Sequence, residues 1–233
     1  ELLMAGHEVV GTYRRGIGLA GSLEGTVGLT LRQVDLSYPL ADLGSIDAIV
    51  HAAATTPAPG IIEADYRRDN STATDMLVEA AVSCGCSQFI YLSTLSVYGP
   101  ISTAVVDEKT PLSKPDLYGA TKLEGERRIA SHQDSFSSIA LRLPGVIGRG
   151  AHGHWLYGVA TALIEGRTLT AFNLDAPFNN ACHVTDLARF VASLCGRDWR
   201  GFDAVVLGAR GMVTVREAIE RLAKAMDVTS SIN

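Results

Sequence analysis

Tyr118 and Lys122 are the residues whose types and spacing first suggest chemistry. They stand four positions apart in PDLYGATKLEGE (115–126), at the start of an expected helix. Side chains at that spacing share one helical face. A phenol has a pKa of about 10 and is a poor base at neutral pH, but a neighbouring ammonium group favours its ionised form. The pair suits proton transfer to or from an alcohol, although this common spacing does not establish a site by itself.

Hydroxyl-bearing and small residues end two of the expected strands. The stretch YLSTLSVYG (91–99) carries Ser93, Thr94 and Ser96, and IDAIVHAAA (46–54) ends in small residues on which a flat ring could lie. The carboxyl ends of parallel strands meet at one edge of a sheet, where ligands bind. We therefore expect both strand ends to lie near the tyrosine and the lysine.

Strand-like and helix-like stretches alternate along the chain. Short apolar or β-branched runs are typical of strands covered on both faces, and the stretches between them have apolar residues at helical spacing. The expected strands are 8–14, 29–35, 46–54, 87–94, 137–144, 168–172 and 202–208, and the expected helices are 71–85, the tyrosine helix, 154–166, 184–196 and 214–226. Thr185 is the expected N-cap of helix 184–196. The alternation predicts an α/β fold with a doubly wound, Rossmann-like parallel sheet.

Six motifs in register now point to one family. They are DAIVHAA at 47–53, Asp69–Asn70, STLSVYG at 93–99, YGATK at 118–122, RLPGVIGRG at 142–150 and HVTDLARFV at 183–191. In this order, the chain from Gly6 to about Leu222 resembles the extended short-chain dehydrogenase/reductase family, also called the NAD-dependent epimerase/dehydratase family.

The resemblance implies that Thr94, Tyr118 and Lys122 are catalytic. In the family, the tyrosine moves the substrate proton. The lysine lowers the tyrosine pKa and holds the cofactor ribose, and the threonine binds the reacting oxygen. Ser93 is expected to face into the sheet, because alternate strand residues face opposite sides. Ser96 is either a second substrate contact or a turn hydroxyl that bonds to local backbone.

The resemblance also implies an NAD or NADP site. Arg14 follows Tyr13, which stands where NAD-preferring relatives carry an acidic residue, so a cation there favours the 2′-phosphate of NADP. A solvated surface arginine is the alternative. The other expected cofactor contacts are Asp35 and Leu36 beside the adenine, His51, Ala52 and Ala53 at the strand end, Asn70 steadying the backbone or capping a helix, Tyr118 and Lys122, and Pro144 and Val146 beside the nicotinamide.

The implied substrate is a nucleotide sugar. Leu95 and Ser96 stand where dehydratases of the family carry an Asp-Glu pair, so dehydration is not expected, whereas keto-sugar reduction and epimerisation both remain open. Asn180 is the expected substrate contact beyond the catalytic region. A reductase of a small non-sugar carbonyl compound and a non-catalytic cofactor-sensing binder are the alternatives. No metal site is expected, since His152 and His154 lack a third ligand.

Two regions are expected along the chain. Residues 1–150 should form the dinucleotide-binding core, and residues 151–233 should combine a small substrate-binding region with completion of the sheet. A Gly-rich phosphate-binding turn follows the first strand of this fold, and none precedes Glu1. We therefore expect that strand and turn to lie upstream, leaving 8–14 and 46–52 without direct pairing. A relative that has lost cofactor binding is the alternative.

Composition limits the other classes of function. The formal net charge of −5 gives no support to a nucleic-acid surface, and no apolar run approaches the roughly 18–20 residues of a membrane span. The four cysteines form no Cys-x-x-Cys pair, which is typical of free thiols in a reducing cytoplasm. The resemblance implies a homodimer formed through the tyrosine helix and its neighbour.

Overall fold

The computed structural model describes residues 1–233 except 17, 41–42, 104, 152–154, 230–231 and 233. The chain forms two compact units. The core unit comprises residues 1–142 and 187–206, and the second unit comprises residues 143–186 and 207–233. The first stretch of the core unit ends at residue 142, against the expected boundary at residue 150, and residues 187–206 return to the core unit from the region in which completion of the sheet was expected.

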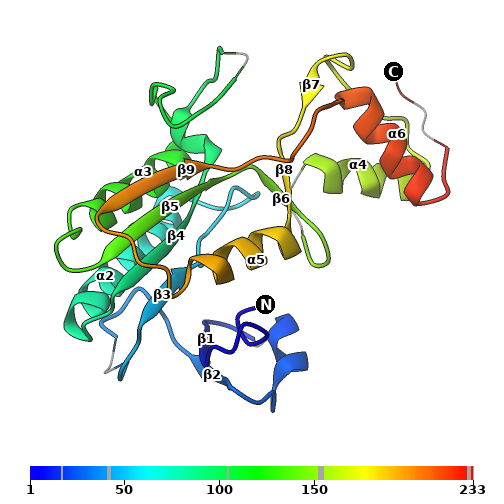
Figure 1. Ribbon diagram of the computed structural model, residues 1–233. Coiled ribbons are helices and arrows are strands. Elements are labelled where there is room, and N and C mark those ends of the chain that lie inside the picture. The colour runs from blue at the N-terminus through cyan, green and yellow to red at the C-terminus, as the bar shows by residue number, and fades with distance from the viewer. Residues whose placement is uncertain (17, 41–42, 104, 152–154, 230–231, 233) are drawn as a thin grey trace. The chain divides into compact units, whose positions relative to one another are not determined.

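The core unit is built on a four-stranded sheet with the order β3, β4, β5, β9. These strands span Ala48–His51, Gln88–Thr94, Ser137–Leu143 and Phe202–Val206, and the β3–β4 and β5–β9 pairs are parallel. Helices α2 (Ala73–Ser83) and α3 (Leu117–Ala130) cover one face, and α5 (Val184–Leu194) covers the other (Figure 1). The predicted Rossmann-like α/β fold is confirmed.

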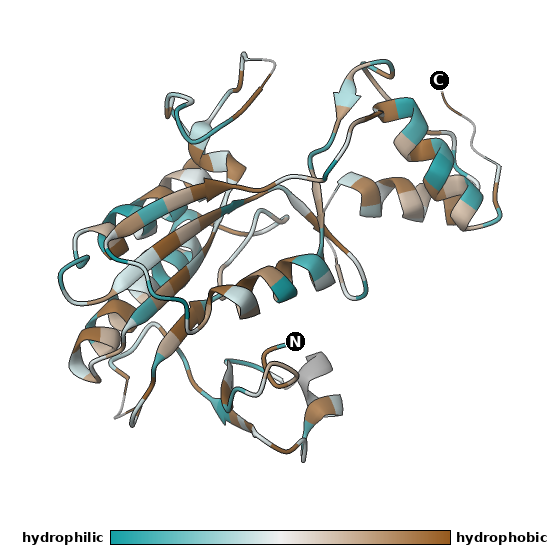
Figure 2. Ribbon diagram, viewed as in Figure 1, coloured by the Kyte–Doolittle hydropathy of each residue, from teal (hydrophilic) through white to brown (hydrophobic). Residues whose placement is uncertain are grey.

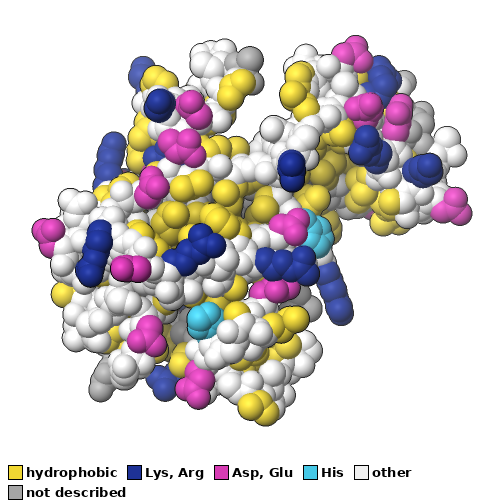
Figure 3. Space-filling view, in the orientation of Figure 1, with side chains coloured by type: hydrophobic (Ala, Val, Ile, Leu, Met, Phe, Trp, Pro, Cys, Tyr) yellow, Lys and Arg dark blue, Asp and Glu magenta, His cyan; other side chains and the backbone are white. Residues whose placement is uncertain are grey.

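The centre of this sheet is apolar because helices cover both of its faces. Phe89, Ile90 and Tyr91 on β4 are fully buried, as are Ala140 and Leu141 on β5. Figure 2 shows hydrophobic colouring along these strands. In Figure 3, positive and negative side chains are interspersed on the visible face, with no large patch of one sign.

A separate parallel pair precedes the sheet. Strand β1 (Val9–Tyr13) pairs with β2 (Leu29–Gln33), and a short 3-10 helix (Gly18–Leu23) lies between them in sequence. Both strands were expected. Within the described residues β1 does not pair with β3. The strand and Gly-rich turn expected upstream of Glu1 stay a prediction.

The helix after β3 begins earlier than expected and contains a wide turn. Helix α1 (Glu63–Tyr66) runs into a π-helical segment (Arg67–Thr72), which continues directly into α2. The sequence pattern had placed the helix start at Ser71. Short π-helical segments inside α-helices often occur at functional sites. This one carries Asp69 and Asn70.

The second unit contains two short strand pairs and two helices. Strand β6 (Gly145–Ile147) pairs with β8 (Ala181–His183), and β7 (Pro177–Phe178) pairs with β10 (Val213–Thr214). Helices α4 (Trp155–Ile164) and α6 (Val215–Ala225) share an apolar cluster that includes Val159, Leu163 and Ile219.

Two expectations for the later chain are wrong. Of the expected strand at 168–172, only Leu169 pairs, in a single parallel bridge with Ile232. The residues on either side of Leu169 lie in loops. Thr185 is not an N-cap, since α5 already begins at Val184. The Thr185 N–H donates instead to His183 Nδ1 at 3.3 Å.

Candidate active site

Helix α3 presents the catalytic candidates in its first turns. The Asp116 side chain caps the helix by accepting the Gly119 N–H at 2.7 Å. Gly119 also permits a close approach, because a Cβ there would lie 2.3 Å from the Ser96 carbonyl oxygen. Ser96 belongs to a 3-10 helix (Leu95–Tyr98) that follows β4. This contact fixes Tyr118 against the end of β4.

Thr94 ends β4, and its hydroxyl is close enough to that of Tyr118 to act on the Tyr118 pKa. Thr94 Oγ1 also accepts the Ser96 N–H at 3.2 Å and lies 3.3 Å from Ser96 Oγ. In the protein alone, burial raises the pKa of Tyr118, and its interaction with Thr94 opposes the rise, because the desolvation of a phenolate outweighs its local stabilisation. The expected lowering of this pKa, which rests on Lys122 together with the positively charged nicotinamide, stays a prediction.

Lys122 is almost completely buried, with 2% of its surface exposed. Its Nζ lies 4.0 Å from the centroid of the Tyr91 ring, which is a cation–π contact. Burial lowers the pKa of Lys122 to about 7, and the carboxylate of Glu126 acts against that fall. Near neutral pH the lysine is thus divided between its charged and neutral forms.

A buried ion pair lies beyond Lys122 on the same helix. Glu126 accepts hydrogen bonds from Arg142 Nη2 at 2.7 Å and Nε at 3.1 Å, and from Ser93 Oγ at 2.5 Å. Arg142 Nη1 donates to the Tyr98 hydroxyl at 2.8 Å. Ser93 is thus buried and faces into the fold, as expected, whereas the next residue, Thr94, is half-buried. The network joins β4, α3 and β5. Sequence reasoning missed it, although an arginine inside an apolar strand was an available signal.

Asn70 connects the loop after β3 to helix α3. Its Nδ2 donates to the Thr55 carbonyl and to Thr121 Oγ1, both at 3.1 Å, and its Oδ1 accepts the Thr55 N–H at 2.8 Å. Thr121 Oγ1 in turn donates to the Tyr118 carbonyl at 2.9 Å. The amide therefore braces the loop against the catalytic helix, and its contacts are not those of a helix cap.

His51 lies inside the core unit. Its Nε2 is 2.9 Å from Thr74 Oγ1, and burial together with the charge of Lys122 lowers the pKa of His51 to about 3. The imidazole is therefore neutral at physiological pH. His51 is buried as a whole residue, so of these three predicted cofactor contacts only the exposed Ala52 and Ala53 offer a surface to a ligand.

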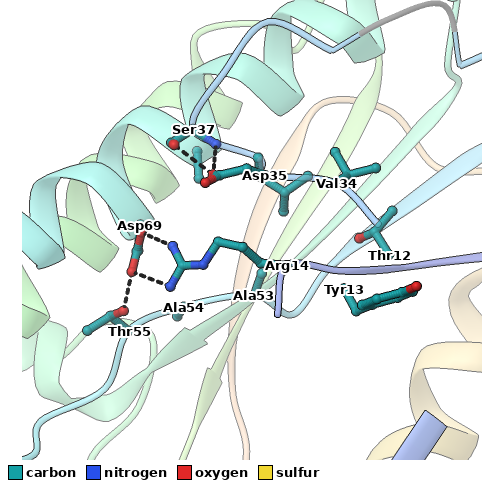
Figure 4. Close-up of a pocket in the computed structure, with 12 residues that line it drawn as sticks. Thr12, Tyr13, Arg14, Val34, Asp35, Ser37, Ala53, Ala54, Thr55 and Asp69 are labelled. Atoms are coloured by element: carbon teal, nitrogen blue, oxygen red, sulfur yellow. Dashed lines mark hydrogen bonds and ion pairs between the residues drawn. The ribbon is translucent and has the colours of Figure 1, made fainter. Parts of the chain in front are cut away.

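A pocket of about 270 Å³ opens beside these small residues (Figure 4). Its lining includes four of the predicted cofactor contacts, namely Arg14, Asp35, Leu36 and Ala53. The Asp35 carboxylate accepts hydrogen bonds from the Ser37 N–H at 3.0 Å and from Ser37 Oγ at 2.7 Å. These hydrogen bonds lower the pKa of Asp35, so it is ionised at neutral pH.

Arg14 does not point freely into the pocket. Both of its terminal nitrogens bond to the Asp69 carboxylate, Nη1 to Oδ1 and Nη2 to Oδ2, the latter at 3.1 Å (Figure 4). The ring of Tyr13 points away from this pair in the same view. Burial raises the pKa of Asp69, but hydrogen bonds from Arg68, Arg14 and Thr55 outweigh that effect and hold it well below its usual range. Sequence reasoning did not foresee this role for Asp69.

Comparison with known proteins shows the family. A model of the family described as "NAD dependent epimerase/dehydratase family" matches residues 1–208. The chain belongs to this family. A UDP-glucuronic acid 4-epimerase from Bacillus cereus, solved in complex with NAD, is 26% identical with a TM-score of 0.83, covering all of this chain and 81% of that one. MoeE5, solved with UDP-glucuronic acid and NAD, is 26% identical with a TM-score of 0.81, covering 100% and 78%.

Curated relatives of the epimerase/dehydratase family match shorter parts of their own length. The UDP-glucose 4-epimerase of Azospirillum brasilense is 30% identical over 164 residues, which cover 61% of this chain and 47% of that protein. An uncharacterised protein, y4nG, of Sinorhizobium fredii is 27% identical over 82% of this chain and 48% of its own length. The chain thus spans about half the length of these relatives.

The pocket residues fit one end of the NAD that the family's name implies. Ala53 and Ala54 leave the wall beside β3 open, and Asp35 and Arg14 supply an acceptor and donors for ribose and base.

The remaining predicted site residues belong to the second unit. Pro144 is buried, Val146 pairs with Cys182 between β6 and β8, and Asn180 is exposed just before β8. Their roles stay predictions. His152 and His154 lie outside the described residues.

Two searches of the described chain were negative. No group of three or more His, Cys, Asp or Glu side chains there is arranged to hold a metal ion. None of the helices described is both long and apolar enough to cross a membrane.

Proposed function

We propose that the protein is an NAD(P)-dependent enzyme that acts on a nucleotide sugar, either by epimerisation or by reduction of a keto sugar. One observation carries the proposal: Tyr118, whose hydroxyl interacts with that of Thr94, stands one helical turn from a buried lysine, in the same unit as a pocket whose lining fits one end of NAD. Relatives named as UDP-glucose 4-epimerases and a dTDP-6-deoxy-L-talose 4-dehydrogenase support the substrate class.

Each of the three residues has a distinct role in this proposal. The nicotinamide, when bound, supplies the site that accepts and returns a hydride. Thr94 Oγ1 and the Tyr118 hydroxyl hold the reacting substrate oxygen between them. Tyr118 takes the proton from that oxygen during oxidation and returns it during reduction. The Lys122 ammonium stabilises the phenolate and offers donors to the cofactor ribose.

The same residues favour these reactions over dehydration. Loss of a hydroxyl group needs an acid next to the threonine, and Leu95 and Ser96 occupy those positions. The retained Thr94, Tyr118 and Lys122 also speak against a non-catalytic binder. A small non-sugar carbonyl substrate stays the second possibility for the same chemistry.

The finer predictions are part of this proposal. Arg14 provides a cation for the 2′-phosphate of NADP, and Asn180 of the second unit contacts the sugar nucleotide. The protein forms a homodimer through α2 and α3, which light scattering coupled to gel filtration tests directly.

Tyr118→Phe tests the proposed function most directly. It removes the oxygen that moves the proton, so turnover with a panel of UDP- and dTDP-sugars should fall by at least a thousandfold while NAD or NADP affinity changes little. Tyr66→Phe is the matched control, because its ring packs 6.2 Å from the Tyr118 ring and keeps that contact in the variant. Tyr66→Phe should retain turnover within a few-fold. A Tyr118→Phe variant within tenfold of the parent would refute the assignment.

A further inference from the structure

Asp69 is the most heavily engaged carboxylate at the cofactor pocket. Besides Arg14, it accepts Arg68 Nε at 2.7 Å, Arg68 Nη2 at 2.9 Å and Thr55 Oγ1 at 2.6 Å. Its own side chain is only 7% exposed, whereas the Arg14 side chain is 34% exposed. The carboxylate is therefore a fixed group, and the arginine is the movable partner at the pocket wall.

Arg14 is held by this carboxylate in a two-bond, side-by-side arrangement. Such bidentate pairs use both terminal nitrogens of the guanidinium and are the geometry by which arginine also binds a phosphate. The same nitrogens cannot serve Asp69 and a 2′-phosphate at once. A second carboxylate, Asp35, also lines the pocket and interacts with Arg14.

We propose that Asp69 determines cofactor specificity by competing with the 2′-phosphate of NADP for the guanidinium of Arg14. This inference rests on the proposed function. NAD binds with the Arg14–Asp69 pair intact. NADP requires Arg14 to leave Asp69, and it places a dianionic phosphate near two carboxylates. The protein therefore accepts both cofactors, and its preference for NADP is much weaker than a lone arginine would give.

Arg68 sets the strength of this competition. It donates two hydrogen bonds to Asp69 and makes a further ion pair with Asp65 at 3.2 Å. By neutralising part of the Asp69 charge, Arg68 weakens the hold of Asp69 on Arg14. Removing Arg68 should therefore tighten that hold and disfavour NADP.

Direct binding of NAD and NADP, measured by calorimetry, tests the inference without reference to turnover. Asp69→Asn should lower the Kd for NADP by about tenfold or more and leave the Kd for NAD within threefold. The gain should vanish in Arg14→Met/Asp69→Asn, because the gain depends on a released Arg14. Glu63→Gln is the matched control, since Glu63 pairs with Arg67, which contacts neither Asp69 nor Arg14 in the described contacts, and it should leave the ratio of the two Kd values unchanged.

A second variant keeps the test decisive if Asp69→Asn does not fold. Arg68→Gln should shift the ratio in the opposite direction, weakening NADP relative to NAD by several-fold. Equal effects on both cofactors, or a gain in NADP affinity that persists without Arg14, would overturn the inference. Failure of the parent protein to bind either cofactor would instead overturn the proposed function.

Discussion

The Arg142–Glu126 and Arg14–Asp69 pairs have the same chemistry and very different surroundings. In both, one guanidinium binds a carboxylate from a helical segment through two of its nitrogens. The side chains of Arg142 and Glu126 are only 7% and 3% exposed, whereas Arg14 is 34% exposed and borders a pocket. The first pair lies where water cannot replace a lost partner, and the second lies where water or a ligand can.

Within the core unit, the buried pair therefore suits holding the strands and the helix in place, and the partly exposed pair suits contact with a ligand. A buried charge has no alternative partner, so the Arg142–Glu126 pair holds β4, α3 and β5 in one arrangement. A half-exposed arginine can exchange partners at low cost, which is what a ligand-dependent contact requires. The two pairs should therefore respond differently to the same substitution.

The largest contrast is expected from Arg142→Met and Arg14→Met. Arg142→Met leaves the Glu126 carboxylate buried and short of its cation, which should lower the free energy of unfolding by about 3–5 kcal/mol. Arg14→Met leaves Asp69 with Arg68 and Thr55 and should cost about 0–1 kcal/mol. Urea unfolding of both variants measures the difference. Similar losses for the two variants would contradict the comparison.

A double variant distinguishes a lost charge partner from lost packing. Arg142→Met/Glu126→Leu removes both charges and should recover most of the stability lost in Arg142→Met, because paired burial of ions contributes little net stability. No recovery would mean that the cost comes from the shape of the arginine side chain.

Lys122→Met should be more stable than the parent, most of all at neutral and lower pH. The folded pKa of Lys122 is about 7, against an ordinary value of 10.5. Between those values the unfolded chain binds more protons, so the destabilisation by Lys122 is full below about pH 7 and disappears as pH rises towards 10.5. Replacing it should add on the order of 2–4 kcal/mol at pH 7 and little at pH 10.5, by the free-energy equivalent of its pKa shift. An equal gain at both pH values would contradict this account. Turnover should be lost, because stability here is given up for function.

Gly119→Ala tests whether the contact between α3 and the end of β4 is as intolerant of change as the buried Arg142–Glu126 pair. The new Cβ would lie 2.3 Å from the Ser96 carbonyl, a backbone atom that cannot rotate away. Overpacking of this kind should cost about 1–3 kcal/mol and displace Tyr118 from Thr94. Gly158→Ala in α4 meets no atom within 4 Å and should gain roughly 0.5–1 kcal/mol. Equal melting shifts in the two variants would remove the special role of the α3 contact.

The fold was largely predictable, and the ion pairs were not. Apolar runs and helical spacing are local properties, so they predicted β3, β4, β5 and β9 and the helices between them. The strand expected at 168–172 failed because its β-branched residues find no partner strand, which is a non-local condition. Tyr118 and Lys122 were found through their spacing on one helix. Asp69 and Arg14 are 55 residues apart, and no local pattern reports that their side chains meet.

The smallest expected effect comes from removing the one hydroxyl group that donates a hydrogen bond to each carboxylate. Ser93 Oγ donates to Glu126 at 2.5 Å, and Thr55 Oγ1 donates to Asp69 at 2.6 Å. Ser93→Ala should cost about 1 kcal/mol, since no solvent reaches Glu126 to replace the lost donor. Thr55→Val should cost only a few tenths of a kcal/mol, because two arginines still bond to Asp69 and one of them, Arg14, is partly exposed. Parallel urea titrations of both variants measure this difference. If Thr55→Val proved the more costly, Asp69 would belong with the buried pair as a structural anchor, and Arg14 would not be free to exchange it for a phosphate.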